Sequence, residues 1–403
     1  MQKRTTSATA KETQAAADGP VERIARIADV LERSGAANEA LGQLAPEVVD
    51  KLHEQRLFRM LLPRAYDGDE VDLGTWFRAM EALGKLDAST AWCIGQAAGC
   101  AMTAAFLAPD VARRIFGPSD AVLAWGAGAQ GKATVVDGGY RITGTWAFAS
   151  GLHNATWLGA HCKVFEADGR PRLRADGRPA ERTALLQREQ ARVHDVWSVM
   201  GLQGTGSDSY EVADFFVPDE VTLDREDLDA RRQGGAVYRF PGSLVYAGAF
   251  GGVMLGIARG TLSDLVALAA SKTPRGAASS LRDAPVFQTE LARLEARFRA
   301  ARAYHLQTLT DVWTAVRDGG DHLTLQQRID IRLAATHTIN EGVAIVTEAY
   351  RAAGQTAIFA ANPFERRLRD ALSASQQVQG RPSHYMTAGR HMLGLPPDTM
   401  MFL

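Results

Sequence analysis

The stretch from Asp137 to Gly151, DGGYRITGTWAFASG, indicates how the middle of the chain folds. Its Asp-Gly-Gly opening is typical of a tight turn, and the alternation of apolar and polar residues that follows is typical of a strand. Gly144 is expected to interrupt this strand before the alternation resumes. The pattern predicts a turn–strand–turn–strand unit with aromatic rings and a hydroxyl gathered at its end, namely Trp146, Phe148 and Ser150. An ordinary hairpin with a buried aromatic face would give the same pattern.

Glycine-separated β runs surround this unit, whereas helical periodicity dominates both ends of the chain. Residues 20–115 carry the apolar spacing of helices, two of which are expected over Leu73–Leu86 and Thr90–Leu107. Strands are expected over 121–125, 133–136, 140–149, 157–164 and 210–217, and C-terminal helices over 243–271, 284–318, 324–353 and 363–393. This order predicts an α+β multi-domain protein. Its parts are a flexible tail (1–19), an N-terminal α domain (20–117), a central β-barrel or β-sandwich domain (118–225) and a C-terminal four-helix-bundle domain (226–403).

The composition is that of an ordinary globular protein, since 46% of the 403 residues are hydrophobic and 23% are charged. Lys and Arg number 45 against 46 Asp and Glu, so the net charge of -1 predicts no attraction to nucleic acid or to anionic membranes. Apolar runs are expected to fall short of the ~18 residues of a membrane span, and the first 19 residues lack the apolar core of a secretory signal. Three cysteines without a Cys-x-x-Cys pair argue against disulfides or structural zinc and favour the cytoplasm.

Five short motifs occur in a fixed order along the chain. They are Leu62-Pro63 with Tyr66-Asp67-Gly68, Asp87-Ala88-Ser89-Thr90-Ala91-Trp92, Gly139-Tyr140-Arg141-Ile142-Thr143-Gly144 leading to Phe148-Ala149-Ser150-Gly151, Met200-Gly201-Leu202-Gln203-Gly204-Thr205-Gly206-Ser207, and Arg369-Asp370-Ala371. On these motifs the chain resembles the acyl-CoA dehydrogenase superfamily over nearly its whole length. Within that superfamily it resembles the reduced-flavin-dependent, two-component monooxygenases, a branch that includes aromatic hydroxylases and indole oxygenases.

The resemblance implies a flavin site in which aromatic residues wall the ring and hydroxyl or backbone groups bond its polar edge. It places Ser150 near the reactive N5/C4a edge of the flavin, with a turn hydroxyl that bonds its own backbone as the alternative. The loop from Gly204 to Ser207 would approach the flavin or its phosphate, or form a plain turn, and Asp370 would hold a helix near the flavin tail. The candidate cofactor-binding residues are Trp92, Trp146, Phe148, Ser150, Gly204, Thr205, Ser207, Arg369 and Asp370.

Three residues depart from the family pattern at the positions of its catalytic groups. Many acyl-CoA dehydrogenases carry a Glu base nine residues after the Arg of Arg-Asp-Ala, where this chain has Val378. The monooxygenase branch commonly has a His one position earlier, and here that residue is Gln377, which hydrogen-bonds but is no base near neutral pH. A second family His would fall near Cys100. These gaps disfavour acyl-CoA dehydrogenation and phenol hydroxylation, and they favour an electron-rich heteroaromatic substrate such as an indole, or a heteroatom oxidation.

His153 is the preferred histidine for catalysis because it lies three residues after Ser150, although a surface or structural role gives the same spacing. His337 and Glu341 have the spacing of a metal-binding pair but no third ligand accompanies them, so no metal site is expected. The run Gly204-Thr205-Gly206 lacks the strand–helix context of a dinucleotide site. Reduced flavin is therefore expected to come from a separate reductase.

The function implied by the resemblance is that of the oxygenase component of a two-component flavin monooxygenase. Such a protein takes reduced FAD or FMN and O2, and through a C4a-hydroperoxyflavin it oxygenates an aromatic or heteroaromatic substrate. The catalytic candidates are Ser150, His153 and Gln377. The alternatives are an acyl-CoA dehydrogenase-like oxidoreductase with another base, and a catalytically inactive binding protein of the same fold. Apolar helices at 246–268 and 331–353, with Gly354-Gln355, imply a homotetramer or else a dimer.

Overall fold

The N-terminal part of the protein consists of helices. The computed structural model describes residues 18–400 and 403, so all but two residues of the tail expected at 1–19 lie outside the described residues. The helices are α2 (Pro20–Ala25), α3 (Ala28–Leu41), α4 (Pro46–Glu54), α5 (Leu73–Leu86), α6 (Ala88–Ala101) and α7 (Pro109–Phe116). α5 covers the residues predicted for it, whereas a 3-10 turn at Met102–Ala105 ends α6 sooner than predicted. Asp87 caps α6 by accepting the backbone N–H of Thr90 at 2.8 Å.

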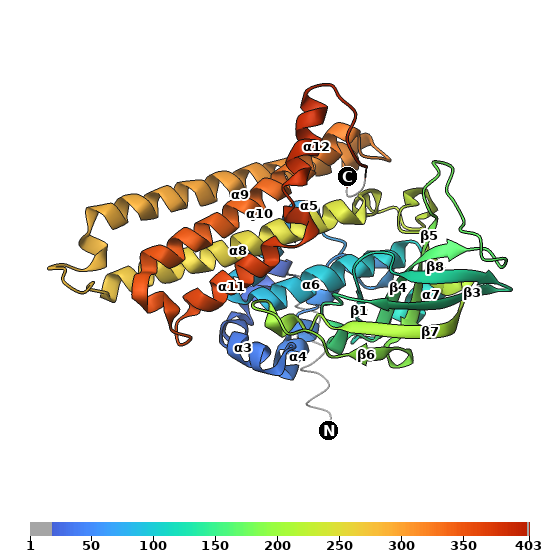
Figure 1. The fold of residues 1–403 in the computed structure, drawn as a ribbon, viewed down its shortest axis with the longest axis horizontal. Helices are drawn as coiled ribbons and strands as arrows, with labels where there is room; N and C mark the ends of the chain where they lie inside the picture. The colour runs from blue at the N-terminus through green and yellow to red at the C-terminus, as the bar shows by residue number, and fades with distance from the viewer. Residues whose placement is uncertain (1–17, 401–402) are drawn as a thin grey trace.

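The central part is one eight-stranded sheet, which Figure 1 shows beside the helices. Its strands are β1 (Leu123–Trp125), β2 (Gly131–Val136), β3 (Gly139–Trp146), β4 (Trp157–Phe165), β5 (Glu181–Gln187), β6 (Arg192–His194), β7 (Ser209–Pro218) and β8 (Thr222–Leu223). The strand order is β6-β7-β3-β2-β4-β5-β8, and β1 pairs with β4. β1 and β2 run parallel to β4, and the other pairs are antiparallel.

The predicted strand break at Gly144 is wrong. β3 runs through this residue to Trp146, and only its register with β7 shifts, between Ile142 and Gly144. Glycine is needed there for another reason, because an added Cβ would lie 2.7 Å from the Cα of Gly131 on β2. Gly144 therefore permits close approach of two strands and does not end one.

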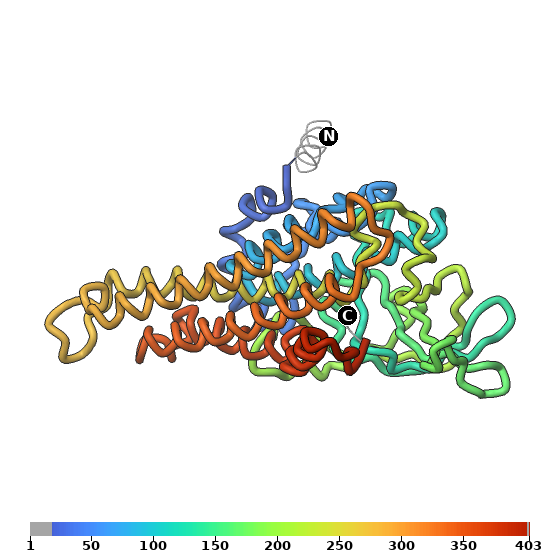
Figure 2. Tube along the Cα trace, turned by 90° about the horizontal axis from the view of Figure 1, so that it is seen from above, coloured from blue at the N-terminus to red at the C-terminus, as the bar shows by residue number. Residues whose placement is uncertain are grey.

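Long helices form the C-terminal part. They are α8 (Gly242–Ser271), α9 (Pro285–Gly319), α10 (Leu325–Ala353), α11 (Pro363–Ser375) and α12 (Ser383–Met392). Figures 1 and 2 both show α8, α9 and α10 lying side by side and extending away from the sheet. The helix predicted over 363–393 is two helices, because a 3-10 turn at Val378–Gly380 and then Pro382 separate α11 from α12. This 3-10 turn begins directly after Gln377, which caps it.

α8 is the central helix of the molecule and packs against both α5 and α10. An added Cβ on Gly84 of α5 would lie 2.5 Å from the Val253 carbonyl oxygen, and one on Gly256 of α8 would lie 2.4 Å from the Glu81 carbonyl oxygen. The two backbones are therefore in direct contact. Contrary to expectation, one helix in the described part of the chain, α8, is long and apolar enough to cross a membrane by length and composition. Its burial between α5 and α10 accounts for that composition.

Candidate active site

Ser150 lies in a loop that follows β3 and pairs through its backbone with the loop at 201–208. The N–H of Ala149 donates to the Asp208 carbonyl at 3.1 Å, and the N–H of Gly151 donates to the Thr205 carbonyl at 2.9 Å. Ser150 itself is only 5% exposed. Two motifs that lie more than fifty residues apart in sequence thus form one site.

A chain of hydroxyl groups runs through this site. The Oγ atoms of Ser150 and Ser207 lie 2.7 Å apart, and Ser207 Oγ lies 2.7 Å from Thr205 Oγ1. At one end, Trp92 Nε1 donates to Ser150 Oγ at 3.2 Å. At the other end, Thr205 Oγ1 donates to the Leu202 carbonyl at 2.8 Å.

The 2.8 Å bond from Thr205 Oγ1 to the Leu202 carbonyl indicates a direction for the protons in this chain. A hydroxyl has one proton to donate, and Thr205 gives its proton to Leu202, so Ser207 must donate to Thr205. Ser150 must then donate to Ser207, while it accepts from Trp92. With these bonds made, the Ser150 hydroxyl keeps a lone pair and has no free proton.

Trp92 extends the site toward the helical part of the protein. Its ring stacks on Phe250 of α8, with ring centroids 4.1 Å apart, and Phe250 in turn stacks on Tyr246 at 5.9 Å. Tyr246 OH lies 3.6 Å from Cys100 Sγ. A continuous aromatic wall therefore leads from Ser150 along α8.

His153 and Asp208 form a hydrogen-bonded pair beside the hydroxyl chain. His153 Nε2 lies 2.7 Å from Asp208 Oδ2, and the other carboxylate oxygen accepts the backbone N–H groups of Val196 at 2.7 Å and Trp197 at 2.8 Å. A neutral His153 with its proton on Nε2 donates to Asp208 and keeps a lone pair on Nδ1. Asp208 thereby orients the imidazole, which fits a group that receives a proton.

Phe148 presents an apolar surface next to Ser150. Its ring is 60% exposed although its φ of 63° lies in the left-handed region that non-glycine residues rarely adopt. The Phe148 ring lies edge-on to Trp197 at 6.0 Å, and Val196 and Met200 on the same loop are 59% and 52% exposed. We call these four residues the Phe148 shelf. An exposed aromatic ring next to buried hydroxyl groups fits a flat ring with one apolar face and a polar edge, such as isoalloxazine.

Trp146 does not fit the role of a flavin wall. Its side chain is fully buried, its Nε1 donates to the His161 carbonyl at 2.7 Å, and its ring stacks on Tyr210 at 5.3 Å. Gly131 and Gly144 pack against the same ring. Trp146 is therefore a core residue of the sheet.

The glycines expected near a flavin phosphate are explained by packing within the protein. An added Cβ on Gly204 would lie 2.6 Å from the Cβ of Asn38 on α3, and one on Gly206 would lie 2.6 Å from the His153 ring. Gly204 and Thr205 belong to a short 3-10 turn, and both are buried. This loop thus approaches α3 and His153, and its glycines are needed for those contacts.

Arg369 and Asp370 hold the loop from the side of α11. Arg369 Nη1 donates to the Met200 carbonyl at 2.7 Å and to Glu39 at 2.6 Å. Asp370 Oδ1 accepts the backbone N–H of Leu202 at 2.7 Å. Burial raises the pKa of Asp370 from 3.8 to about 7. Both residues tie α11 to the site loop, so their contacts are structural.

Gln377 lies outside this group of residues. Its side-chain oxygen accepts the N–H of Gln379 at 2.7 Å and caps the 3-10 turn after α11. Within the described residues, no hydrogen bond links Gln377 to Ser150 or His153. Glu341, whose spacing from His337 is that of a metal-binding pair, forms an ion pair with Arg297. The structure therefore brings Ser150 and His153 together but not Gln377.

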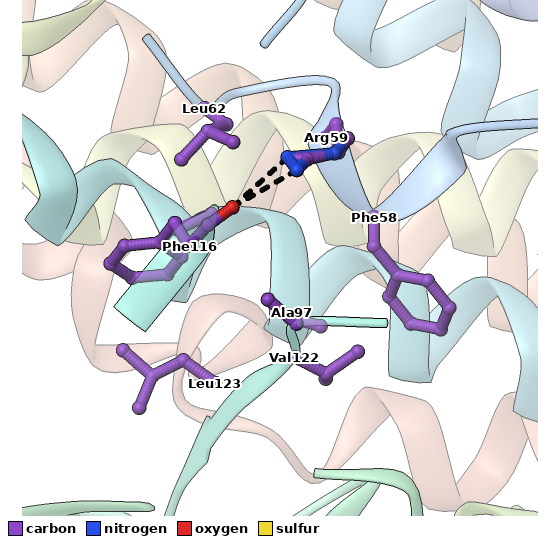
Figure 3. A pocket seen from close by; sticks show the side chains of 9 residues that line it. Phe58, Arg59, Leu62, Ala97, Phe116, Val122 and Leu123 are labelled. Atoms are coloured by element: carbon purple, nitrogen blue, oxygen red, sulfur yellow. Dashed lines mark hydrogen bonds between the residues drawn. The ribbon is translucent and has the colours of Figure 1, made fainter. Parts of the chain in front are cut away.

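The small cavity in Figure 3 lies elsewhere, between the N-terminal helices and β1. Its volume is about 10 Å³, which is room for roughly one water molecule. Arg59 spans its rim by donating to the Phe116 carbonyl at 3.1 and 2.9 Å. It is lined by Phe58, Arg59, Leu62, Ala97, Ala101, Phe116, Ala121, Val122 and Leu123. This cavity is too small for a flavin or an aromatic substrate.

Comparisons with known proteins show what this chain is similar to. Residues 249–379 match the family described as acyl-CoA dehydrogenase, C-terminal domain. The chain is 28% identical over 361 residues to an indole-3-acetate monooxygenase of Pseudomonas putida, covering 88% of each chain. It is 26% identical to HsaA of Mycobacterium tuberculosis, a flavin-dependent monooxygenase oxygenase subunit, over 91% of this chain and 93% of the relative. The crystal structure of 3-HSA hydroxylase from Rhodococcus sp. RHA1 has the same fold, with a TM-score of 0.86 at 23% identity over 96% of this chain and 100% of the other.

Proposed function

We propose that this chain, which belongs to the acyl-CoA dehydrogenase superfamily, is the oxygenase component of a two-component flavin monooxygenase. The relatives include an indole-3-acetate monooxygenase and HsaA, a flavin-dependent monooxygenase oxygenase subunit, and the chain matches both along most of its length. Reduced flavin, supplied by a separate reductase, provides the electrons with which O2 is activated. The residues of the site bind and orient the flavin, exclude water and handle protons.

The Phe148 shelf and Ser150 are the groups that would hold the flavin. The exposed ring of Phe148 and the half-buried ring of Trp197 suit the apolar face of its tricyclic ring. Ser150 would bond the polar edge, as the resemblance implies, with Trp92 and Ser207 fixing the orientation of its hydroxyl. Trp92, buried against Phe250, keeps water away from that hydroxyl.

The direction of the hydroxyl chain is the observation that carries the proposal. Reduced flavin has a proton on N5 and donates there, whereas oxidised flavin has only a lone pair on N5 and accepts. Ser150 already gives its proton to Ser207, so it can accept from a donor but cannot donate. The site is therefore matched to reduced flavin, which is the form that an oxygenase component must capture from its reductase.

The imidazole of His153 is the group that would take up the proton released during oxygen transfer. Asp208 holds the ring by one hydrogen bond and is itself fixed by two backbone N–H groups. A base held in this way needs no reorientation before it accepts a proton. Gln377 takes no part in this step.

The substrate would be an aromatic or heteroaromatic ring that is electron-rich without deprotonation. Gln377 and Cys100 stand where the family commonly has histidines, and burial raises the pKa of the Cys100 thiol to about 12. An indole-like ring needs no phenol base, and the relative from Pseudomonas putida is named for indole-3-acetate. Packing against Tyr246, which is half-buried and stacks on Phe250, would hold such a ring.

We further propose a homotetramer, with a dimer as the smaller alternative, and a cytoplasmic location. Exposed apolar side chains on and after α12, which include Met386, Met392 and Leu393, support contact with another subunit. All three cysteines are free and buried, as suits a reducing compartment. Light scattering at micromolar concentration tests the assembly, and a stable monomer would contradict it.

Anaerobic titration with reduced and oxidised FAD and FMN tests the central proposal. Reduced flavin should bind at least roughly tenfold more tightly, because only its N5–H can meet Ser150 without breaking the chain. With a generic NADH:flavin reductase, the protein should then couple O2 uptake to oxygenation of indole. Equal affinities for both forms, or a tightly held oxidised flavin that an acyl-CoA reduces, would instead support the dehydrogenase alternative.

A further inference from the structure

The methionines of the described chain fall into two groups by exposure. One group is at most 6% exposed and comprises Met60, Met80, Met102 and Met254. The other group is 52% to 68% exposed and comprises Met200, Met386, Met392 and Met400. A thioether is oxidised to a sulfoxide where an oxidant reaches its sulfur. Among residues 18–400, the exposed group is therefore the one open to oxidation in the folded protein.

Met200 differs from the other exposed methionines in its position. It belongs to the Phe148 shelf and lies in the segment between β6 and β7 that leads into the hydroxyl chain. Met386 and Met392 lie on α12, and Met400 follows that helix. Figure 1 shows α12 at the top of the molecule and β6 and β7 near its lower edge. A reagent released at the candidate active site would thus meet Met200 first.

The backbone around Met200 is fixed by α11. Arg369 Nη1 donates to the Met200 carbonyl at 2.7 Å, and the Leu202 N–H donates to Asp370 Oδ1 at 2.7 Å. Between them, Gly201 packs so closely that an added Cβ would lie 2.1 Å from the Arg369 carbonyl oxygen. The segment cannot swing out to solvent without losing these contacts. A chemically altered side chain at position 200 therefore stays on the shelf.

Hydrogen peroxide is the oxidant that the proposed function supplies. When O2 takes two electrons from reduced flavin and no substrate is oxygenated, H2O2 is released beside Ser150. The Met200 sulfur attacks one oxygen of H2O2 and the O–O bond breaks. An S=O bond forms, and the second oxygen leaves as water with both protons. The sulfur loses two electrons and the peroxide gains them, so the step balances without a further reactant.

We propose that Met200 is a modification site for this peroxide, and that its sulfoxide lowers the affinity of the protein for flavin. The inference rests on the proposed function, which supplies the peroxide and assigns the Phe148 shelf to the flavin ring. The sulfoxide places a polar S=O group against the apolar face of that ring, which offers it no hydrogen-bond donor. Uncoupled turnover would then close the site, and a methionine sulfoxide reductase would reopen it.

Added peroxide tests the effect on the flavin site without any turnover. The flavin-free protein is treated with H2O2, and the sulfoxides are located by peptide mass spectrometry. Reduced FMN is titrated anaerobically before and after the treatment. The affinity of the wild type should fall roughly five- to thirtyfold, because an unpaired polar group is brought against an apolar surface.

Three variants assign this loss to one residue. Met200→Leu forms no sulfoxide at this position, so its affinity should be the same before and after treatment. Met400→Leu removes a methionine of similar exposure away from the site and is the matched control. It should lose affinity as the wild type does. Met200→Gln, which is polar from the start, should resemble the oxidised wild type before any treatment.

Turnover in the presence of catalase tests whether the peroxide acts where it forms. The protein, FMN, NADH and a generic flavin reductase are mixed in air without substrate, and catalase removes peroxide from the bulk solution. The oxidation of each methionine is divided by its oxidation in added peroxide, which corrects for differences in access. This ratio should be several-fold higher for Met200 than for Met400.

The outcomes separate this inference from the proposed function. Equal ratios for Met200 and Met400 would overturn the inference even if the protein oxygenates indole. An unchanged affinity for reduced FMN after full oxidation of Met200, or a Met200 that stays reduced in added peroxide, would overturn it as well. Selective oxidation of Met200 in a protein that oxygenates nothing with reduced flavin would support the modification site and contradict the proposed function.

Discussion

Asp370 Oδ1 accepts the backbone N–H of Leu202 at 2.7 Å. This bond joins α11 to the loop whose next residues supply Thr205 and Ser207, the inner members of the hydroxyl chain. The loop begins with Gly201, where an added Cβ would lie 2.1 Å from the Arg369 carbonyl oxygen. The position of the hydroxyl chain thus depends on a carboxyl group far from it in sequence.

Asp370→Asn should change how stability depends on pH. Burial raises the pKa of Asp370 to about 7, so folding favours the protonated form. The stabilisation is complete below the ordinary value of 3.8 and is lost as pH rises through about 7. The amide of the variant stays neutral and still offers an oxygen to Leu202. Relative to wild type, the variant should therefore gain stability, by on the order of a few kcal/mol, between pH 4 and pH 8.

Urea denaturation at several pH values measures this effect. The exposed Asp29→Asn serves as the control and should follow the wild type. A stability difference between Asp370→Asn and wild type that stays constant from pH 4 to pH 8 would contradict the assignment of a raised pKa to this carboxyl group.

Ser150→Ala should impair oxygen transfer more than flavin binding. The methyl group keeps the packing under Trp92 but offers no acceptor to the flavin edge, and one hydrogen bond in such a site contributes on the order of 1–3 kcal/mol. Coupled product should fall roughly five- to a hundredfold, with hydrogen peroxide released in its place. The ratio of product to peroxide checks this. Unchanged coupling in Ser150→Ala would leave the segment at 146–151 as an ordinary hairpin.

Ser207→Ala should weaken the preference for reduced flavin by a different route. Without Ser207 as acceptor, the Ser150 hydroxyl is free to donate its proton, so it can meet the N5 lone pair of oxidised flavin. Affinity for oxidised flavin should rise while affinity for reduced flavin changes little. Anaerobic and aerobic titrations of this variant beside Ser150→Ala check the result. A rise in the selectivity for reduced flavin would show that the proton direction assigned here is wrong.

Gly204→Ala should destabilise the fold. The new Cβ would lie 2.6 Å from the Asn38 Cβ and 3.2 Å from the Ser89 Cβ, so the loop must move away from α3 and α6. Overpacking of this kind costs roughly 1–3 kcal/mol. Gly389→Ala is the control, since nothing lies within 4 Å of its added Cβ and Ala favours the helix. Thermal unfolding of both variants measures the difference, and equal melting temperatures would contradict the packing argument.

The helices were largely predictable from sequence because their signals are local. α5 was predicted at its observed residues, since its apolar spacing begins after Asp72, an N-cap that accepts from Thr75. Strand β5 was missed because an arginine-rich, turn-forming segment precedes it, and β8 was missed because two residues carry no periodicity. The three-part architecture therefore followed from the sequence, while the number of strands did not.

Only the site residues that lie close together within one sequence motif were predictable from the sequence. Ser150 and His153 are close in sequence, and the structure places both in the loop after β3. Asp208 was missed although it directly follows Ser207, because its pairing with His153 across 55 positions leaves no local signal. The assignment of Trp146 to the flavin site was wrong. The alternation of residues along a strand shows which residues share a face of the sheet, but it does not show which part of the protein covers that face.

The backbone contact between α5 and α8 sets a limit on how such an enzyme can be retargeted. With Gly84 and Gly256 in contact across the crossing, α8 cannot slide or rotate to admit a larger ring. New substrate ranges must then come from exchanging side chains on a fixed frame. A directed-evolution library confined to positions 246 and 250 should yield altered selectivity at little loss of stability, whereas random changes along the α5–α8 crossing should mostly yield unfolded protein.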